Sequence, residues 1–152
     1  MIRYVLLGAC IAFAGCGASA VELHAQAAIA TGDVLEVAHG AIRSRRSAEV
    51  TRAIEAAPTQ ETARSARDAI DVRYEPAIAA YEAARVVHQA WIRLIVLAWD
   101  GRPFDVATAM ALAHDMVRAF HELRVVVERL GVELPDLGAT VNAAMAAVQE
   151  GI

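Results

Sequence analysis

The sequence predicts an all-α protein, arranged as an antiparallel helical hairpin or bundle of three long helices followed by a short C-terminal helix. Two observations predict this class. Apolar residues recur every three or four positions over long stretches, which is the spacing of one helix face. No segment alternates apolar and polar residues over a useful length, as a half-buried strand does. The composition agrees, because 57% of the 152 residues are apolar, 5% are aromatic and 35 are alanine.

The first helix is predicted over residues 19–57. Ser19, with Glu22 three residues later, matches the capping box that marks a helix start, and Pro58 ends the helix. Its apolar seam is rich in alanine, which permits close approach of a partner helix. The seam residues are Leu23, Ala27, Ala30, Val34, Val37 and Ala41.

The second helix is predicted to begin after Thr59, as its N-cap, and to end at Asp100 and Gly101. Pro76 lies inside this stretch. Because proline lacks a backbone N–H and crowds the preceding turn, we expect a kink or a break there. The seam, in which Ala77 and Ala84 leave no room for larger side chains, is Ile70, Tyr74, Ala77, Tyr81, Ala84, His88, Trp91, Ile95 and Ala98.

A third and a fourth helix complete the prediction. Pro103 suits the first turn of the third helix, and Gly131 ends it. The third helix has the bulkiest seam, formed by Val106, Ala109, Ala113, Met116, Phe120, Leu123, Val127 and Leu130. The short fourth helix is marked by Val141, Met145 and Val148.

The connections between the first three helices are short, which predicts antiparallel neighbours. With the first turn at Pro58, we expect Glu49 to face Arg67 and Arg45 to face Asp71. Opposite charges across the seam support this pairing.

The N-terminus has the pattern of an export signal. Met1 to Arg3 carries one positive charge, and Tyr4 to Ala14 is an uncharged apolar run. The last two residues of this run and the two that follow it resemble the lipobox of bacterial lipoproteins: Phe13, Ala14, Gly15 and Cys16. The resemblance implies removal of residues 1–15 and lipidation of Cys16. Residues 16–18 then form a tether and residues 19–152 a single helical domain.

Two other fates of the N-terminus remain open. Ala18, Ser19 and Ala20 form an A-x-A cleavage site, which leads to a soluble secreted protein. Residues 4–21 carry no charge and are long enough to remain as an uncleaved membrane anchor. All three fates place the domain beyond the cytoplasmic membrane. The lipoprotein resemblance, with Gly17 after the cysteine, points to the periplasmic face of the outer membrane.

Histidines are the candidate ligands or bases of this chain. His88 lies on the seam of the second helix and is expected to meet the third helix near His114 and Asp115. Imidazole and carboxylate groups suit zinc or copper, so these three residues are a candidate metal site. The alternative is a hydrogen-bonded core His88 with the other two residues over solvent. No nucleophile elbow or glycine-rich phosphate loop occurs, so we expect a protein without catalysis or cofactor.

One concentration of basic residues lies in the second half of the first helix, and it consists of Arg43, Arg45, Arg46 and Arg52. It suits contact with a phosphate-bearing surface, such as lipid A or an anionic leaflet. Pairing with Asp68 and Asp71 on the second helix is the alternative. A formal net charge of −4 argues against a nucleic-acid partner.

The sequence therefore predicts a lipid-anchored helical protein of the cell envelope with a structural or protein-interaction role. One alternative is a small metal- or ligand-binding periplasmic bundle around His88 and His114. Another is a membrane-anchored phage-type protein, of the exclusion or the spanin class. The order of an uncleaved anchor followed by a helical coil resembles inner-membrane spanin subunits.

Overall fold

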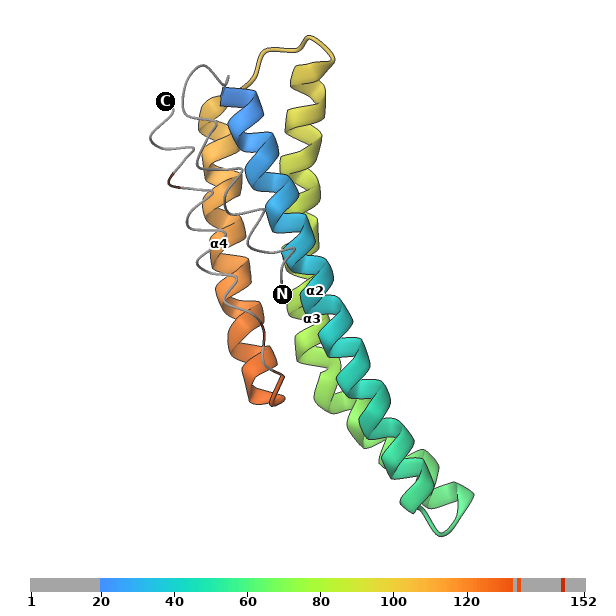
Figure 1. The fold of residues 1–152 in the computed structure, drawn as a ribbon. Helices are drawn as coiled ribbons and strands as arrows, with labels where there is room; N and C mark the ends of the chain where they lie inside the picture. The colour runs from blue at the N-terminus through green and yellow to red at the C-terminus, as the bar shows by residue number, and fades with distance from the viewer. Residues whose placement is uncertain (1–19, 133, 135–145, 147–152) are drawn as a thin grey trace, which may run out of the picture.

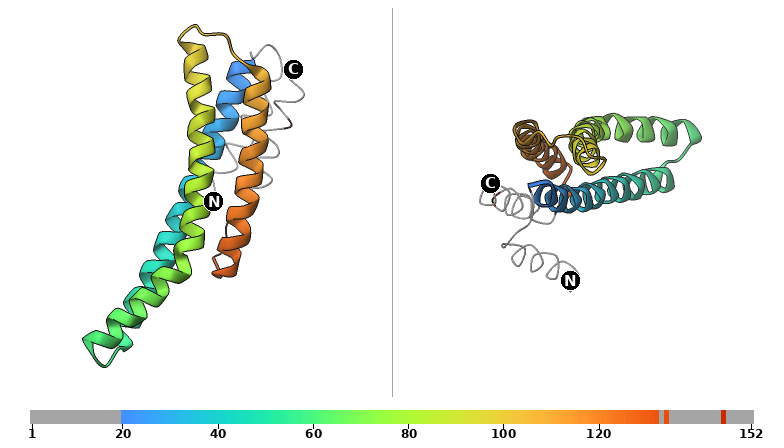
Figure 2. Two further views of the ribbon diagram at one scale, coloured as in Figure 1. Left: turned by 180° about the vertical axis from the view of Figure 1, so that it is seen from behind. Right: turned by 90° about the horizontal axis from the view of Figure 1, so that it is seen from above.

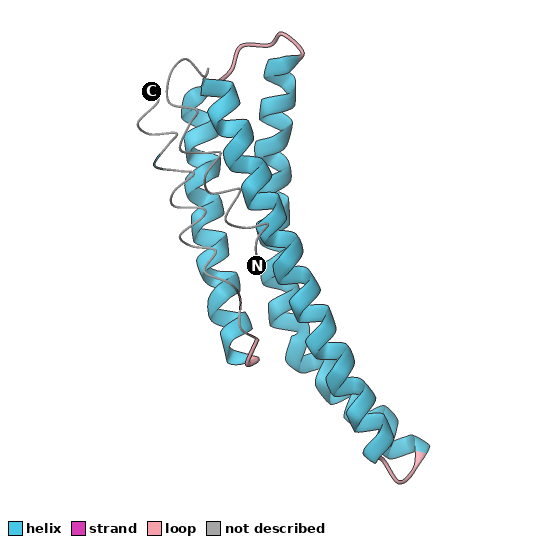
Figure 3. Ribbon diagram, in the orientation of Figure 1, coloured by secondary structure: helices cyan, strands magenta, loops and turns pink. Residues whose placement is uncertain are grey.

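The chain forms long α-helices in the computed structural model, which describes residues 20–132, 134 and 146. The helices are α2 (Ala20–Ala56), α3 (Gln60–Trp99) and α4 (Val106–Arg129), as Figure 3 shows. No strand occurs among the described residues. The predicted all-α class is therefore confirmed.

Several sequence predictions lie outside the described residues. They concern the signal and lipobox region, the cap at Ser19 and the short C-terminal helix of Val141, Met145 and Val148. Within the described part the helices number three, so the fourth helix stays a prediction.

The turn between α2 and α3 consists of Ala57, Pro58 and Thr59. Thr59 is the N-cap, as predicted, and it forms a capping box with Thr62. The Thr62 backbone N–H donates to the Thr59 hydroxyl at 3.2 Å, and the Thr59 backbone N–H donates to the Thr62 hydroxyl at 3.1 Å. These two bonds satisfy donors that a helix start otherwise leaves without a partner.

Helix α3 continues through Pro76 without interruption, so of the predicted kink or break the break does not occur. The ribbon of α3 nevertheless changes direction partway along its length in Figures 1 and 2. A helix survives a proline when packing on both sides of it holds the chain. Tyr74 and Ala77, which flank the proline, are both fully buried.

The connection from α3 to α4 differs from the prediction at Pro103. Gly101 has a φ of +85°, a conformation that glycine adopts without strain, and it follows the α3 cap residue Asp100. Helix α4 then begins after Asp105, whose side chain accepts the Thr108 backbone N–H at 3.1 Å. Pro103 therefore precedes the cap instead of lying in the first helical turn, because a capping aspartate follows it two residues later.

The buried seams of α3 and α4 are those predicted. Every buried residue of the two helices occupies a predicted seam position. On α3 they are Tyr74, Ala77, Ala84, Trp91 and Ile95, and on α4 they are Ala109, Ala113, Met116, Phe120, Leu123 and Val127.

The buried face of α2 is wider than predicted. Leu23, Val37 and Ala41 from the predicted seam are only half-buried. A second seam with the same spacing of three and four is buried beside it, and consists of His24, Ala28, Thr31, Leu35, Ala38 and Ile42. One seam was too narrow a prediction because α2 contacts both α3 and α4.

The three helices are not packed together over their whole length. Figures 1 and 2 show α4 beside the second half of α3, whereas α2 and α3 continue side by side beyond the end of α4. The end of α4 lies near Arg45, whose Nη2 would be 4.0 Å from a Cβ atom at Gly131. We call residues 43–73 the arm, and α4 together with residues 20–42 and 74–99 the three-helix part.

Candidate functional site

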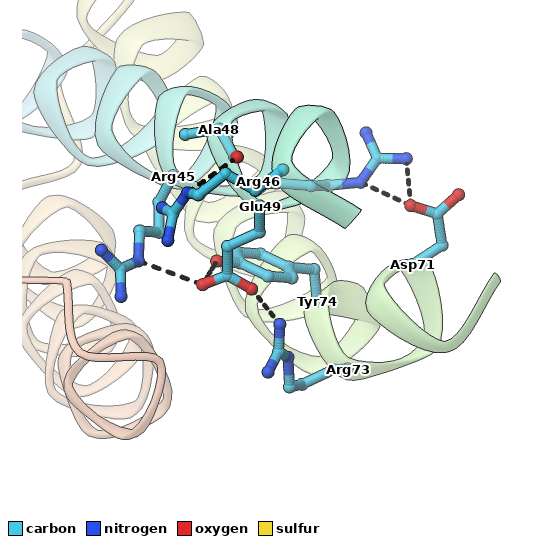
Figure 4. Close-up of polar contacts among 8 residues, drawn as sticks. Arg45, Arg46, Ala48, Glu49, Asp71, Arg73 and Tyr74 are labelled. Carbon is cyan, nitrogen blue, oxygen red and sulfur yellow. Dashed lines mark hydrogen bonds and ion pairs between the residues drawn. The ribbon is translucent and has the colours of Figure 1, made fainter. Parts of the chain in front are cut away.

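Two arginines of the α2 cluster, Arg45 and Arg46, lie at the base of the arm (Figure 4). Arg46 donates from Nε at 2.9 Å and from Nη2 at 2.7 Å to Asp71 Oδ1 on α3. Arg67 is a second neighbour of the same carboxylate, at 3.7 Å from Oδ2. The pairing of this cluster with Asp71, one of the two sequence alternatives, is therefore present for Arg46.

Glu49 is the centre of a second group of polar contacts at the base of the arm. Its side chain is 16% exposed. Oε1 accepts from Arg45 Nε and from the Tyr74 hydroxyl, each at 3.1 Å, and Oε2 accepts from Arg73. The Arg73 guanidinium also lies 5.7 Å from the centre of the Tyr74 ring. A single carboxylate thus joins α2 to Tyr74, the first buried side chain of α3 along the chain, which borders the arm (Figure 4).

The two predicted charge pairs across the helices are wrong in detail. Arg45 reaches Glu49, one turn further along its own helix, instead of Asp71. Glu49 bonds to Arg73 and Tyr74 instead of Arg67. A turn of a single helix brings residues four apart within reach, so the local partner competes with the one across the seam.

The other two arginines of the cluster have no carboxylate partner among the described residues. Arg43 is exposed, and Arg52 donates to the backbone carbonyl of Ala48 at 3.2 Å. These two guanidinium groups are therefore the part of the cluster that stays open to another molecule.

The predicted metal site does not assemble. Among the described residues, no three or more His, Cys, Asp or Glu side chains are grouped so as to hold a metal ion. His114 is exposed, and Asp115 pairs with Arg118 one turn along α4. His88 turns to α2 instead, where its Nε2 donates to the Ala28 carbonyl at 2.8 Å.

Gly32 explains why His88 fits against α2. A Cβ atom at this position would lie 3.1 Å from His88 Cε1 and 3.3 Å from its Nε2. The absence of a side chain lets the imidazole approach the α2 backbone. His88 is thus half-buried and hydrogen-bonded, close to the structural role that the sequence offered as the alternative to metal binding.

His24 is the most unusual polar residue of the described chain, and the sequence analysis did not single it out. It is 0% exposed, and its Nδ1 accepts the Trp91 indole N–H at 3.2 Å. Its Nε2 is buried without a hydrogen-bond partner in the part of the chain that the structure describes. Burial lowers the pKa of this imidazole from its ordinary value of 6.5. The signal that could have found it is the second α2 seam, on which it lies.

Aromatic rings enclose His24. The Trp91 ring meets it nearly edge-on, with centroids 5.8 Å apart and an interplanar angle of 84°. The Phe104 ring lies at 5.3 Å and 63°. These contacts of His24 therefore bring together α2, α3 and the connection that precedes α4.

Comparisons with known proteins give no relative for this chain: no family model, curated protein or solved structure matches it. No helix of the described residues is long and apolar enough to cross a membrane. Cys16, the predicted lipidation site, lies outside the described residues.

Proposed function

We propose that this chain is a non-catalytic helical protein of the bacterial cell envelope that binds another envelope protein through its arm. The observation that carries the proposal is the exposure of the arm. No side chain between Ile42 and Tyr74 is buried, although α2 and α3 run through this region as regular helices. An isolated pair of helices without a buried core gains little free energy from packing, so its surface is available for a partner.

The charges of the arm favour a protein partner over an anionic lipid surface. The arm holds seven of the 14 arginines and five of the 18 acidic residues, which gives it a net charge of +2 in a chain of −4. Four of its arginines already pair with its own carboxylates, namely Arg45, Arg46, Arg67 and Arg73. The remaining surface mixes both signs, as the polar rim of a protein interface does, whereas binding to anionic lipid requires a clustered positive charge.

We also propose that α2 and α3 form an antiparallel hairpin and that α4 returns along α3. Two contacts support it. Arg46, late in α2, pairs with Asp71 in the first half of α3, whereas Ala28, early in α2, accepts from His88 in the second half. The tip of the hairpin is then the turn at Pro58.

A lipid anchor at Cys16 gives this architecture its purpose. Four residue steps separate Cys16 from Ala20, where α2 begins, and an extended chain covers at most about 14 Å over that distance. The 37 residues of α2 then span about 56 Å at 1.5 Å per residue. The arm tip would stand well away from the membrane, where another envelope component is within reach.

Site-specific photo-crosslinking in cells tests the proposed function. A photoreactive residue at Arg43 or Arg52 should yield a discrete crosslinked protein, whereas the same residue at Arg93, exposed on α3 outside the arm, should not. An arm-deletion variant, without residues 44–57 and 60–73, should not compete with the full chain for the crosslinked protein. Equal crosslinking from Arg93 and Arg52, or undiminished competition by the deletion variant, contradicts an arm-borne partner site.

The anchor is tested separately. Intact mass of the membrane-extracted protein should show loss of residues 1–15 and addition of acyl chains, and Cys16→Ser should abolish both. A Cys16→Ser variant with unchanged mass and membrane fractionation contradicts lipidation, and leaves the uncleaved anchor as the membrane attachment.

A further inference from the structure

The hydrogen bond between His24 on α2 and Trp91 on α3 depends on the protonation state of the imidazole. His24 can accept the Trp91 indole N–H only through an Nδ1 lone pair, because the indole nitrogen is a donor alone. The proton of the neutral imidazole must therefore lie on Nε2. Within residues 20–132, that N–H is buried without an acceptor, so only one of the two nitrogen atoms of the neutral imidazole has a hydrogen bond.

Protonation of His24 removes the bond. A proton from solvent would occupy the Nδ1 lone pair, so that two N–H donors, of His24 and Trp91, point at each other. Among the described residues, the resulting imidazolium would have two buried donors without acceptors and a charge packed between the Trp91 and Phe104 rings.

We propose that His24 and Trp91 form a pH-sensitive latch, which holds the start of α2 against α3 and the Phe104 segment while His24 is neutral and releases it on acidification. The latch goes beyond the proposed function, because it involves neither the arm nor the anchor. Its place in the fold gives it leverage: it fastens α2 in its second turn, close to where the helix begins at Ala20.

Among the described residues, no charged partner opposes this effect. Desolvation is the cause of the lowered pKa of His24. The charged or titratable residues within three positions of His24, Trp91 or Phe104 are Glu22 on α2, His88 and Arg93 on α3, and Arg102 and Asp105 before α4. Arg93 and Arg102 are exposed. His88 Nε2 is engaged by Ala28, and the Asp105 carboxylate by Thr108. Glu22 has an interaction of its own, and no charge interaction contributes to the shifted pKa of His24, whose cause is desolvation.

The direction of the pH effect follows from the lowered pKa. The folded state binds the proton less readily than the unfolded chain, whose histidine titrates near 6.5. The contribution of His24 to stability is therefore complete above pH 6.5. It is lost as the pH falls from 6.5 through the lower pKa of the folded protein.

The first experiment is NMR of the full-length chain in detergent, with the imidazole nitrogens labelled. At pH 7.5 His24 should be the Nε2–H tautomer, and its Nδ1 shift should change at a pH below 6.5. In a Trp99→Phe background Trp91 is the only tryptophan, and Trp99 is 62% exposed, so its replacement leaves the core intact. The Trp91 emission should move to the red over the same pH range, as the latch opens and the indole meets water.

A pair of variants isolates His24. His24→Gln keeps an acceptor for Trp91 but cannot be protonated, and His114→Gln removes an exposed histidine. Between pH 7 and pH 5 the melting temperature of each variant is compared. The melting temperatures of the wild type and of His114→Gln should fall by about 3–5 °C more than that of His24→Gln.

The latch is overturned by an Nδ1–H tautomer at pH 7.5, or by a Trp91 emission that stays constant while His24 titrates. Both results come from chains with His24 in place, so they decide the question even where His24→Gln fails to fold. Failure of the latch leaves the arm proposal untouched, since crosslinking at Arg52 does not depend on His24.

Discussion

The α2 seam that faces α3 is apolar from Ala28 to Ile42 except at Thr31, and it becomes charged at Arg45 and Glu49, one and two turns further on. The helix does not change, but what holds it to α3 does. In the three-helix part the contact is made by buried side chains such as Trp91 and Ile95. In the arm it is made by ion pairs on half-buried or exposed atoms.

These two kinds of contact contribute different amounts of free energy to the stability of the molecule. Burial of apolar surface stabilises by about 25 cal/mol per Å², whereas an exposed ion pair contributes about 0–1 kcal/mol. The three-helix part should therefore unfold last, and the arm should open locally at much lower cost. A segment that opens readily can also adjust its surface to a partner, which fits the role proposed for the arm.

Truncation of one isoleucine in each region is the strongest test of this comparison. Ile95 is 1% exposed in the three-helix part, and Ile54 is 49% exposed in the arm. Ile95→Ala should lower the free energy of unfolding by about 2–5 kcal/mol, because it leaves a cavity. Ile54→Ala should change it by about 0.5 kcal/mol or less. Chemical denaturation measures both, and comparable losses would mean that the arm has an apolar core of its own.

The next largest effect is expected at Glu49, which receives three donors at the base of the arm. Glu49→Gln should cost about 1–2 kcal/mol, because charged hydrogen bonds are lost while the Tyr74 hydroxyl remains part-buried. Glu82→Gln is the control, since Glu82 is exposed and pairs with Arg85 on the surface of α3, and it should cost at most about 0.5 kcal/mol. Equal losses would show that Glu49 is an ordinary surface pair.

The sequence predicted the regions of the fold in which one periodic face dominates. All buried residues of α3 and α4 were on the predicted seams, since each of these helices buries one face against the rest. Helix α2 buries two adjacent faces, and one seam could not describe both. That is also why His24 escaped notice, although its spacing from Ala28 and Thr31 repeats the rule used elsewhere.

The candidate sites were harder to predict than the fold, because side-chain direction decides them. The arginine cluster was visible as a concentration of charge, but Arg45 chose a partner on its own helix. His88 was expected to turn to α4 and bonds to α2 instead, in the space that Gly32 leaves free. A seam position indicates that a residue is near a neighbouring helix without indicating which neighbour it contacts.

The capping box at the arm tip is a smaller test of how independent the arm is. Thr59→Ala removes the hydroxyl that accepts the Thr62 N–H, and should cost the start of α3 about 1 kcal/mol. Because we expect the arm to open separately from the three-helix part, this loss should raise amide exchange in the arm only. Hydrogen exchange measures it residue by residue, with the Trp91 region as internal reference. Faster exchange at both places would mean that the arm and the three-helix part unfold as one unit.

The smallest expected effect compares two glycines of α2 within the three-helix part. Replacement of glycine by alanine inside a helix stabilises by about 0.5–1 kcal/mol when nothing obstructs the new methyl group. No atom lies within 4 Å of a Cβ at Gly40, so Gly40→Ala should gain that amount.

Gly32→Ala should lose the gain, because its methyl group meets His88 at 3.1 Å and displaces the imidazole from the Ala28 carbonyl. We expect it to be less stable than Gly40→Ala by about 1 kcal/mol, the value of one hydrogen bond. A double-mutant cycle with His88→Ala separates the two contributions, since the benefit of alanine at position 32 should return once the imidazole is absent. An equal gain at both glycines in the wild-type background would show that His88 moves aside without cost, and that close approach of α2 and α3 does not depend on Gly32.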